Sequence, residues 1–401
     1  MAPVTEGQVR VGTHEFRRIN IALFCAGFVT FVTLYDVQPL LPLFAQEFSV
    51  SPAVASLPLS FSTIALAVGM LIAGTVSETL GRRQVMTVAL FLTSLLALAT
   101  FFSHSFESLL VLRTLQGLVL AGVPSVAMAY LAEEMDAQSI GHAMGLYISG
   151  NAVGGMSGRI GSALLCKYVP WHTAIAIIGA ISLLLCLVFV KSLPPSTNFR
   201  QRPFQPRYLI TSLAQHMRDP GLLCLYALAF LSMGGFISLY NYIGFRLLAP
   251  PYNLTHYQVS LIFLVYLLGS FSSGMVGSLI HRFGRPFMIR LSLSVMLAGV
   301  LITLSTALPV IVAGVGIFTC GFFSAHTIAS SWVGRRARTA KAQASSLYLF
   351  TYYLGSSVSG TAGGLFWVNL GWNGVALLIT LLIVAAFGVA ALLLRMPVVA
   401  E

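Results

Sequence analysis

Twelve predominantly apolar runs follow one another along this chain of 401 residues. A helix needs about 20 mostly apolar residues to cross the hydrocarbon core of a bilayer, and each run is long enough to do so. The runs lie near residues 19–44, 54–76, 84–103, 108–131, 142–166, 172–193, 221–246, 257–280, 286–307, 309–332, 342–366 and 373–395. The chain lacks the alternating segments of about 10 residues that are typical of outer-membrane β-barrels. We therefore expect an all-α membrane protein.

Charged residues are too scarce for a soluble protein of this size. They make up 8% of the chain, and hydrophobic residues make up 57%. Typical soluble domains contain roughly 25% charged residues, because a water-facing surface is built largely from them. The composition therefore excludes a soluble enzyme and leaves a polytopic protein whose main partner is the lipid bilayer.

The 22 Lys and Arg residues are distributed unevenly between the two sides that the runs define. With the N-terminus placed in the cytoplasm, 18 of them fall on the cytoplasmic side, Lys167 and Arg246 on the outer side, and Arg113 and Arg159 within runs. Such an excess sets the orientation of membrane proteins. We predict a multi-pass membrane protein with an uncleaved first span and both termini in the cytoplasm. The net charge of +11 then reflects loop placement, and we expect no nucleic-acid partner.

The chain has no pattern typical of a cofactor site or of catalysis. Its five cysteines are scattered, without Cys-x-x-Cys or Cys/His spacing. It has no phosphate-binding Gly-x-x-x-x-Gly-Lys-Ser/Thr loop and no His-Glu-x-x-His motif. We expect no metal, no cofactor and no enzymatic activity, with a gradient rather than ATP as the energy source.

One polar stretch divides the twelve runs into two sets of six. It covers residues 194–220, is rich in proline and arginine, and follows the sixth run. We predict an N-terminal six-helix bundle over residues 1–193, a cytoplasmic linker over 194–220 and a C-terminal six-helix bundle over 221–401.

The two predicted bundles contain an internal repeat. The segment from Gly74 to Arg82 matches the segment from Gly277 to Arg285 at an offset of 203 residues. A second set of matches has an offset of 201 residues, and it joins Leu146-Tyr147 with Leu347-Tyr348, Gly154 with Gly355, and Trp171 with Trp372. An even number of helices per repeat gives both halves the same orientation. Parallel repeats of this kind enclose a substrate site near the bilayer midplane.

Three segments of the first half resemble motifs of the major facilitator superfamily. Residues 74–83 are similar to its loop signature Gly-x-x-x-Asp-Arg-x-Gly-Arg-Arg, with Glu78 in place of Asp and Thr79 in place of the basic residue. Arg113-Thr-Leu-Gln116-Gly117 resembles the Arg-x-x-Gln-Gly motif of the fourth helix. Residues 150–155 resemble the antiporter motif Gly-Pro-x-x-Gly-Gly, with Asn151 in place of proline.

Other segments point to one group within that superfamily. Residues 145–159, 322–332 and 343–357 resemble the YnfM-type inner-membrane members, which belong to a twelve-helix, drug/proton antiporter-like group. The resemblance implies the major facilitator fold, a location in the bacterial inner (plasma) membrane, a gating motif and a helix-interface motif. The gating motif comprises Gly74, Glu78, Gly81, Arg82 and Arg83, and the interface motif comprises Gly150, Asn151, Gly154, Gly155 and Gly158.

Asp36 is the one acidic residue that lies well inside a run. Ionisable residues at bilayer depth are costly and usually functional. The resemblance implies that the first and fourth helices line a common cavity, so Asp36 and Arg113 are candidates for proton coupling. A static ion pair, a polar vestibule or direct substrate binding are the alternatives for Asp36, and support of helix packing is the alternative for Arg113.

Further polar and aromatic residues inside the runs are candidates for substrate binding. They are Arg159, Tyr240, Asn241, Tyr147, Tyr348, Tyr352 and His326. A role in packing is the alternative for the tyrosines. An interhelical hydrogen bond is the alternative for His326, and a structural ion pair is the alternative for Arg159.

We predict a proton-coupled secondary transporter that exports a small organic compound by alternating access. Its expected small-molecule partners are protons and that compound, and we expect the protein to be a monomer. One alternative is a proton symporter or facilitator that imports a small organic anion or sugar. Another is a transporter-like membrane sensor that signals through residues 194–220.

Overall fold

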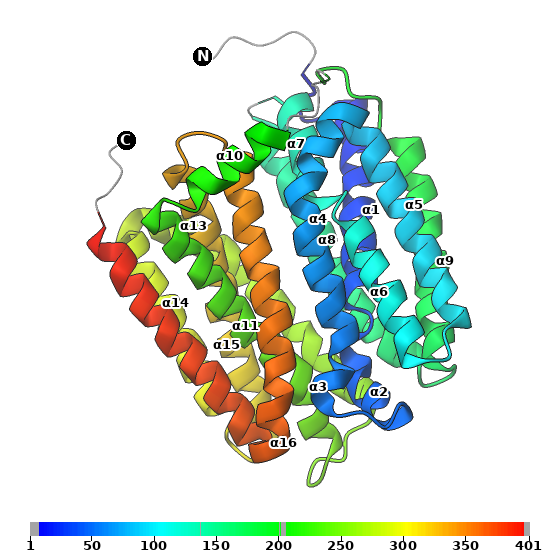
Figure 1. Ribbon diagram of the computed structural model, residues 1–401, viewed down its shortest axis with the longest axis vertical. Coiled ribbons are helices and arrows are strands. Elements are labelled where there is room, and N and C mark those ends of the chain that lie inside the picture. The colour runs from blue at the N-terminus through cyan, green and yellow to red at the C-terminus, as the bar shows by residue number, and fades with distance from the viewer. Residues whose placement is uncertain (1–7, 137, 200, 202–205, 397–401) are drawn as a thin grey trace. The chain divides into compact units, whose positions relative to one another are not determined.

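The computed structural model describes residues 8–136, 138–199, 201 and 206–396. Helices dominate this part of the chain, and its β-type pairing is an isolated bridge between Val9 and Met135. The helices of the first half are α1 (His14–Tyr35), η1 (Gln38–Leu40), α2 (Leu41–Glu47), α3 (Pro52–Ala55), α4 (Leu57–Leu80), α5 (Arg82–Ala99), η2 (Thr100–Phe102), α6 (Phe106–Leu120), α7 (Pro124–Glu134), α8 (Ile140–Leu165) and α9 (Trp171–Ser192). Those that follow are α10 (Pro206–His216), α11 (Pro220–Leu248), α12 (His256–Ser260), η3 (Leu261–Val265), α13 (Tyr266–Phe283), α14 (Arg285–Ile302), α15 (Leu308–Arg336) and α16 (Lys341–Arg395) (Figure 1).

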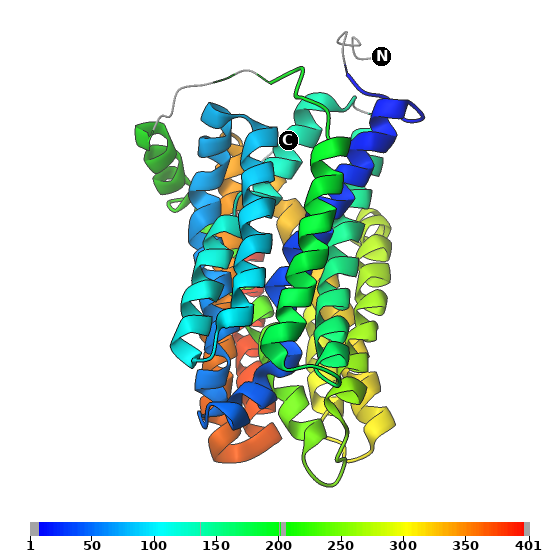
Figure 2. The same ribbon diagram turned by 90° about the vertical axis from the view of Figure 1, so that its right-hand side faces the viewer.

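Ten helical segments of the described residues are long and apolar enough to cross a membrane. One of them is α16, which is two helices in sequence because Gly371 has non-helical backbone angles (φ 58°, ψ −142°). α8 is a further helix of 26 residues, and its many glycines and Arg159 lower its hydropathy. With α16 counted as two and α8 added, the structure agrees with the twelve predicted runs and confirms the all-α membrane class. Within each unit the long helices run side by side (Figure 2).

The first predicted run is not one uninterrupted helix. α1 ends at Tyr35, and a short 3₁₀ helix and α2 continue the run. Pro39 explains the break, because its ring nitrogen cannot donate a hydrogen bond to the Tyr35 carbonyl and its ring would collide with that carbonyl. The break lies next to Asp36, and it leaves the last carbonyl groups of α1 without hydrogen-bond donors from a following helical turn.

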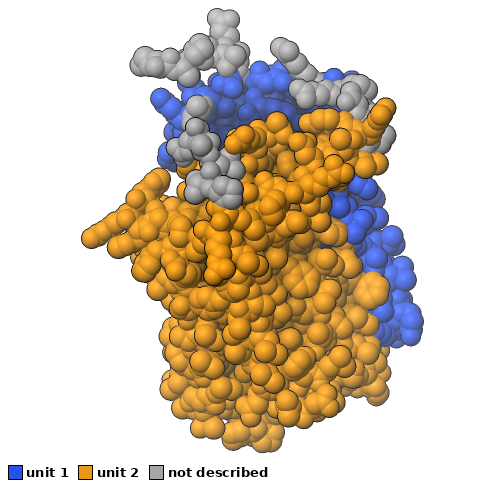
Figure 3. Space-filling view, turned by 60° about the vertical axis from the view of Figure 1, so that its left-hand side comes forward, with its two compact units in different colours: residues 1–37, 65–206 blue, residues 38–64, 207–401 orange. Residues whose placement is uncertain are grey.

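The chain forms two compact units (Figure 3). Unit 1 comprises Met1–Val37 and Ala65–Pro206, and unit 2 comprises Gln38–Ile64 and Arg207–Glu401. The segment 38–64, which the sequence assigns to the first bundle, therefore clusters with the second half of the chain. α10 occupies the end of the predicted linker, whereas Arg200 and residues 202–205 of that linker lie outside the described residues.

In unit 1, α1 and α8 are in direct backbone contact along a stripe of glycines. A Cβ atom on any of these glycines would collide with a main-chain carbonyl of α1, and the pairs are Gly150 with Phe24, Gly154 with Phe28, and Gly158 with Val32. Small residues allow such close approach between membrane helices. The interface motif thus holds α8 against α1, and Asn151 also packs against Gly27 of α1.

Unit 2 repeats this contact between α11 and α16. A Cβ atom on Gly355 would collide with the carbonyl of Phe230, and these two residues follow Gly154 and Phe28 by 201 and 202 positions. The repeated loops also share a backbone conformation, because Gly81 and Gly284 both have positive φ angles, of 97° and 76°. The sequence repeat therefore corresponds to a repeated packing arrangement within each unit.

The glycine stripe predicts a position-specific loss of stability. We expect Gly154→Ala to lower the free energy of unfolding by about 1–3 kcal/mol, because the added methyl group must displace the backbone of α1. Gly145→Ala on the same helix is the matched control, since no atom lies within 4 Å of its Cβ position. Denaturant unfolding in detergent micelles measures both. Equal losses for the two variants would contradict the role of the stripe.

Candidate functional site

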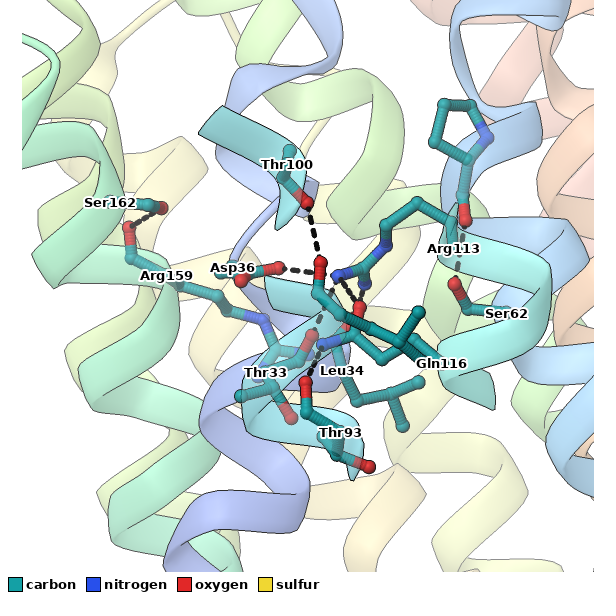
Figure 4. A network of polar contacts seen from close by, with 12 residues as sticks. Thr33, Leu34, Asp36, Ser62, Thr93, Thr100, Arg113, Gln116, Arg159 and Ser162 are labelled. Carbon is teal, nitrogen blue, oxygen red and sulfur yellow. Dashed lines mark hydrogen bonds and ion pairs between the residues drawn. The ribbon is translucent and has the colours of Figure 1, made fainter. Parts of the chain in front are cut away.

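Asp36 and Arg113 form a buried ion pair where α1 ends against α6 (Figure 4). Arg113 Nη1 lies 3.1 Å from Asp36 Oδ1. Both residues have a relative exposure of 0%. The contact expected between the first and fourth spans is therefore present.

Arg113 also satisfies the broken end of α1. Its Nη1 donates to the Thr33 carbonyl at 2.8 Å, and its Nη2 donates to the Leu34 carbonyl at 2.7 Å. The last carbonyls of a helix lack intrahelical partners, and a cation at that end is favoured by the helix dipole. Gln116, one turn further along α6, accepts from Arg113 Nη1 at 2.6 Å. The Arg-x-x-Gln spacing thus places two polar side chains on the face of α6 that meets α1.

The second carboxylate oxygen of Asp36 has a different environment. Oδ2 is buried and has no hydrogen-bond partner among the described residues. A buried polar atom without a partner carries a desolvation cost. Oδ1 therefore contacts a guanidinium, whereas Oδ2 contacts no hydrogen-bond donor among the described residues.

Arg159 on α8 approaches the same end of α1 (Figure 4). It is buried, its Nη1 donates to the Gly155 carbonyl at 2.8 Å, and its guanidinium carbon lies 3.9 Å from the centre of the Tyr35 ring. Cations are attracted to the face of an aromatic ring at this distance. Unit 1 therefore places two buried guanidinium groups near the end of α1.

The gating motif forms a polar cluster centred on Arg82. The Arg82 side chain donates to the Gly74 carbonyl at 3.2 Å and to Ser77, and it lies 3.8 Å from Glu78. Its strongest contact is with Glu133 at the end of α7, at 2.8 Å. Arg83 donates instead to the Val190 carbonyl of α9 at 2.9 Å. The Glu78 substitution leaves a carboxylate near Arg82, although Glu133 is the nearer one.

Glu133 and its neighbour Glu134 are functional candidates that our sequence analysis missed. Glu134 accepts from Thr197 Oγ1 at 2.7 Å and from the Asn198 backbone at 3.0 Å. Gln201 donates to the Thr79 carbonyl at 2.8 Å. The start of the linker is thereby attached to the gating motif. The available signal was an acidic pair at the end of the fourth span, on the same side as the basic motif.

Unit 2 brings three of the substrate-binding candidates together. The Tyr348 hydroxyl lies 3.0 Å from His326 Nδ1, and the His326 and Tyr352 rings are 4.8 Å apart. These residues line a narrow pocket with Leu228, Ala229, Ser232, Ile289, Phe322, Ala325 and Ala329. The ionisable side chains that line this pocket are those of His326, Tyr348 and Tyr352. The lining is therefore mostly apolar and aromatic.

The remaining candidates are engaged in packing contacts. Tyr240 is buried and its hydroxyl lies 2.7 Å from Thr319 Oγ1, inside an aromatic cluster with Phe236 and Phe263. Tyr147 belongs to the hydrophobic core of unit 1. Their predicted substrate contacts stay predictions.

The segment 38–64 is attached to α11 and α16 by hydrogen bonds between polar residues, of which our sequence analysis singled out only Asn241. Gln38 Nε2 donates to Asn241 Oδ1 at 2.8 Å. On α4, Thr63 Oγ1 lies 2.7 Å from Ser357 Oγ, and Ser357 Oγ donates to the Ser60 carbonyl at 2.9 Å. Asn241, a substrate-binding candidate, is thus part of this attachment.

Comparison with known proteins agrees with this architecture. The family model of the Major Facilitator Superfamily matches residues 20–360. The uncharacterized MFS-type transporter YybF of Bacillus subtilis (strain 168) is 49% identical over 387 residues, covering 96% of each chain. The inner membrane transport protein YnfM of Escherichia coli (strain K12) is 47% identical over 378 residues, covering 94% of this chain and 91% of YnfM. A bacterial homologue of the human lysosomal transporter Spinster, solved in an inward-facing and occupied conformation, has a TM-score of 0.74 at 14% identity, covering 96% of this chain and 97% of its own.

The repeated bundles and the family match define the class of protein as a secondary transporter. The chain belongs to the Major Facilitator Superfamily. This confirms the predicted fold, family and resemblance to YnfM-type members.

The burial of the Asp36–Arg113 pair predicts a large cost for removing one of its partners. We expect Asp36→Ala to lower the free energy of unfolding by about 3 kcal/mol, because it leaves a buried guanidinium without its carboxylate. Glu78→Ala is the control, since Glu78 is half-exposed at 3.8 Å from Arg82 and such pairs contribute at most about 1 kcal/mol. Chemical denaturation compares the two variants. A loss at Asp36 no larger than that at Glu78 would show that the pair is not a structural contact.

Proposed function

We propose that this transporter is proton-coupled, that it exports a small organic compound by alternating access, and that Asp36 is its proton site. The observation that carries the proposal is the asymmetry of the buried carboxylate. Oδ1 is held by Arg113, whereas Oδ2 is buried and has no partner among the described residues.

The surroundings of Asp36 allow the proton to bind and leave without loss of local structure. Protonation removes the negative charge, yet Arg113 keeps the Thr33 and Leu34 carbonyls and Gln116 as acceptors. The guanidinium favours the ionised carboxylate, and poor solvation favours the protonated one. Access of water to Asp36 therefore decides which form prevails. Coupling requires that proton and substrate bias the same conformational equilibrium to different extents.

We assign substrate binding to the pocket of His326, Tyr348 and Tyr352. His326 lies four residues from Phe322, the middle residue of the 29-residue helix α15, which is about 6 Å along a helix. Because α15 is longer than a hydrocarbon core about 30 Å thick, its middle is expected to lie near the centre of the bilayer. A midplane position is what parallel-repeat transporters use for their substrates. The uncharged lining favours a neutral organic compound with an aromatic or apolar part.

The two polar clusters are suited to act as gates at opposite ends of the helices. One is the attachment of segment 38–64 to α11 and α16, and the other is the cluster of Arg82 with Glu133. Each includes a hydrogen bond between polar side chains, Thr63 with Ser357 in the first and Arg82 with Glu133 in the second. We propose that they open alternately during the transport cycle.

The second candidate function is import of a small organic anion or sugar by symport or facilitation. The buried guanidinium of Arg159, stacked on Tyr35, is the observation that favours it. A flux assay in proteoliposomes with the pH gradient imposed in either direction separates export from import.

Asp36→Asn is expected to abolish gradient-driven transport. A thermal-shift screen of purified protein identifies a transported compound, and proteoliposomes with an imposed pH gradient then measure its flux. We expect flux by Asp36→Asn to fall to the level of protein-free liposomes, while exchange of the compound without a gradient continues. Glu107→Gln, an exposed acid at the start of α6, is the control and retains transport. Unchanged gradient-driven flux in Asp36→Asn would refute the proton site.

Cross-linking of segment 38–64 to α16 is expected to stop the cycle. The side-chain oxygens of Thr63 and Ser357 are 2.7 Å apart, so Thr63→Cys with Ser357→Cys brings two thiols together in a background without native cysteines. Oxidation should abolish transport and reduction should restore it, whereas each single variant is unaffected by oxidant. Full activity of the oxidised double variant, with the cross-link confirmed by mass spectrometry, would show that this contact is not a gate.

A further inference from the structure

α10 has an exposed apolar edge beside two arginines. Ile210 and Met217 have exposed fractions of 66% and 47%. Met217 lies in the turn after α10, but its N–H still bonds the Leu213 carbonyl at 3.0 Å, so the helical register continues to it. Arg207 and Arg218 are exposed as well. At 3.6 residues per turn, the pair Ile210 and Met217 forms one edge of the helix, and the two arginines form the adjacent edge.

The opposite face of α10 attaches the helix to unit 2. Leu209, Ser212 and His216 are buried. A ring nitrogen of His216 lies 3.1 Å from the Ala340 carbonyl, in the connection between α15 and α16. α10 therefore lies at the end of unit 2 where membrane-spanning helices end and begin, and it is inclined to them (Figure 1). This is the level of the bilayer surface.

Arg207 on α10 and Arg218 in the turn after it have no carboxylate partner within the described part of the chain. The nearest acid in sequence, Asp219, is bound by Arg336 at 2.7 Å and caps the first turn of α11. Burial alone would raise the pKa of the Asp219 carboxyl, but the Arg336 hydrogen bond and the backbone N–H groups of Leu222 and Gly221 hold it below its ordinary value. Asp219 therefore remains ionised in its own ion pair, and the positive edge of α10 faces outward.

We propose that α10 lies in the headgroup region of the adjacent leaflet and binds anionic phospholipids. Ile210 and Met217 reach the acyl boundary, and Arg207 and Arg218 contact lipid phosphates. An apolar edge bordered by arginines is the pattern of helices that lie in a membrane interface, and each surface arginine adds attraction to an anionic leaflet. The proposal is independent of which compound the protein transports and of its coupling ion.

Hydrogen–deuterium exchange of the full chain in nanodiscs tests the proposal. We compare nanodiscs of phosphatidylcholine alone with nanodiscs that also contain phosphatidylglycerol. We expect the amides of α10 to exchange at least about 5-fold more slowly in the anionic nanodiscs, and the amides of α11 to be unchanged. Arg207→Gln with Arg218→Gln should remove the difference, whereas Arg207→Lys with Arg218→Lys should retain it because the charge remains.

A second pair of variants tests the apolar edge. Ile210→Ser with Met217→Ser should speed exchange of α10 in both lipid compositions. Thr211→Ser with Gln215→Ser, on the exposed polar edge, is the matched control and should behave as the original chain. The α11 amides report in every case whether unit 2 is folded. Equal exchange in the two compositions, or a difference that persists without the arginine charges, would overturn the assignment of anionic lipid. No effect of the Ile210 and Met217 changes would overturn insertion of the apolar edge.

Discussion

The structure of unit 1 depends on how a broken helix end is satisfied inside a membrane. Pro39 ends α1 at Tyr35, and the freed carbonyls cannot be left to lipid, where no water can hydrogen-bond them. Arg113 binds two of these carbonyls and also pairs with Asp36. One guanidinium thereby maintains the helix end and holds a carboxylate at bilayer depth. These two contacts give a structural reason for placing the charge of Arg113 at a depth where charges are costly.

The repeat organises the rest of the molecule by the same physics in each unit. The glycines of α8 and α16 bring each helix against the backbone of its partner, α1 or α11. Close backbone contact suits helices in lipid, where association depends on packing more than on the hydrophobic effect. The two units share this helix packing, but their buried polar sites differ. Unit 1 holds the ion pair, and unit 2 holds an aromatic pocket without formal charge.

Two further polar contacts lie outside these two sites, one at helix ends and one within helices. Arg82 and Glu133 join the loop after α4 to the end of α7, and Thr63 and Ser357 join segment 38–64 to α16. The contact between Arg82 and Glu133 is partly exposed, whereas the contact between Thr63 and Ser357 is buried. In our proposal these contacts exchange during transport, while the glycine stripes keep each pair of helices together.

The sequence by itself determined the membrane class and the approximate positions of the spans, because hydrophobic length is a local property that the bilayer imposes directly. Matched motifs determined the repeat and the family, because they are read from the residues alone. The sequence also identified Asp36 and Arg113, since charges are conspicuous within apolar runs. Only the tertiary structure revealed that Glu133 is the main partner of Arg82, that segment 38–64 belongs to unit 2, and that His326, Tyr348 and Tyr352 share one pocket. These facts depend on which faces of distant helices meet, and helices that are apolar on nearly every side carry little sequence signal for that choice.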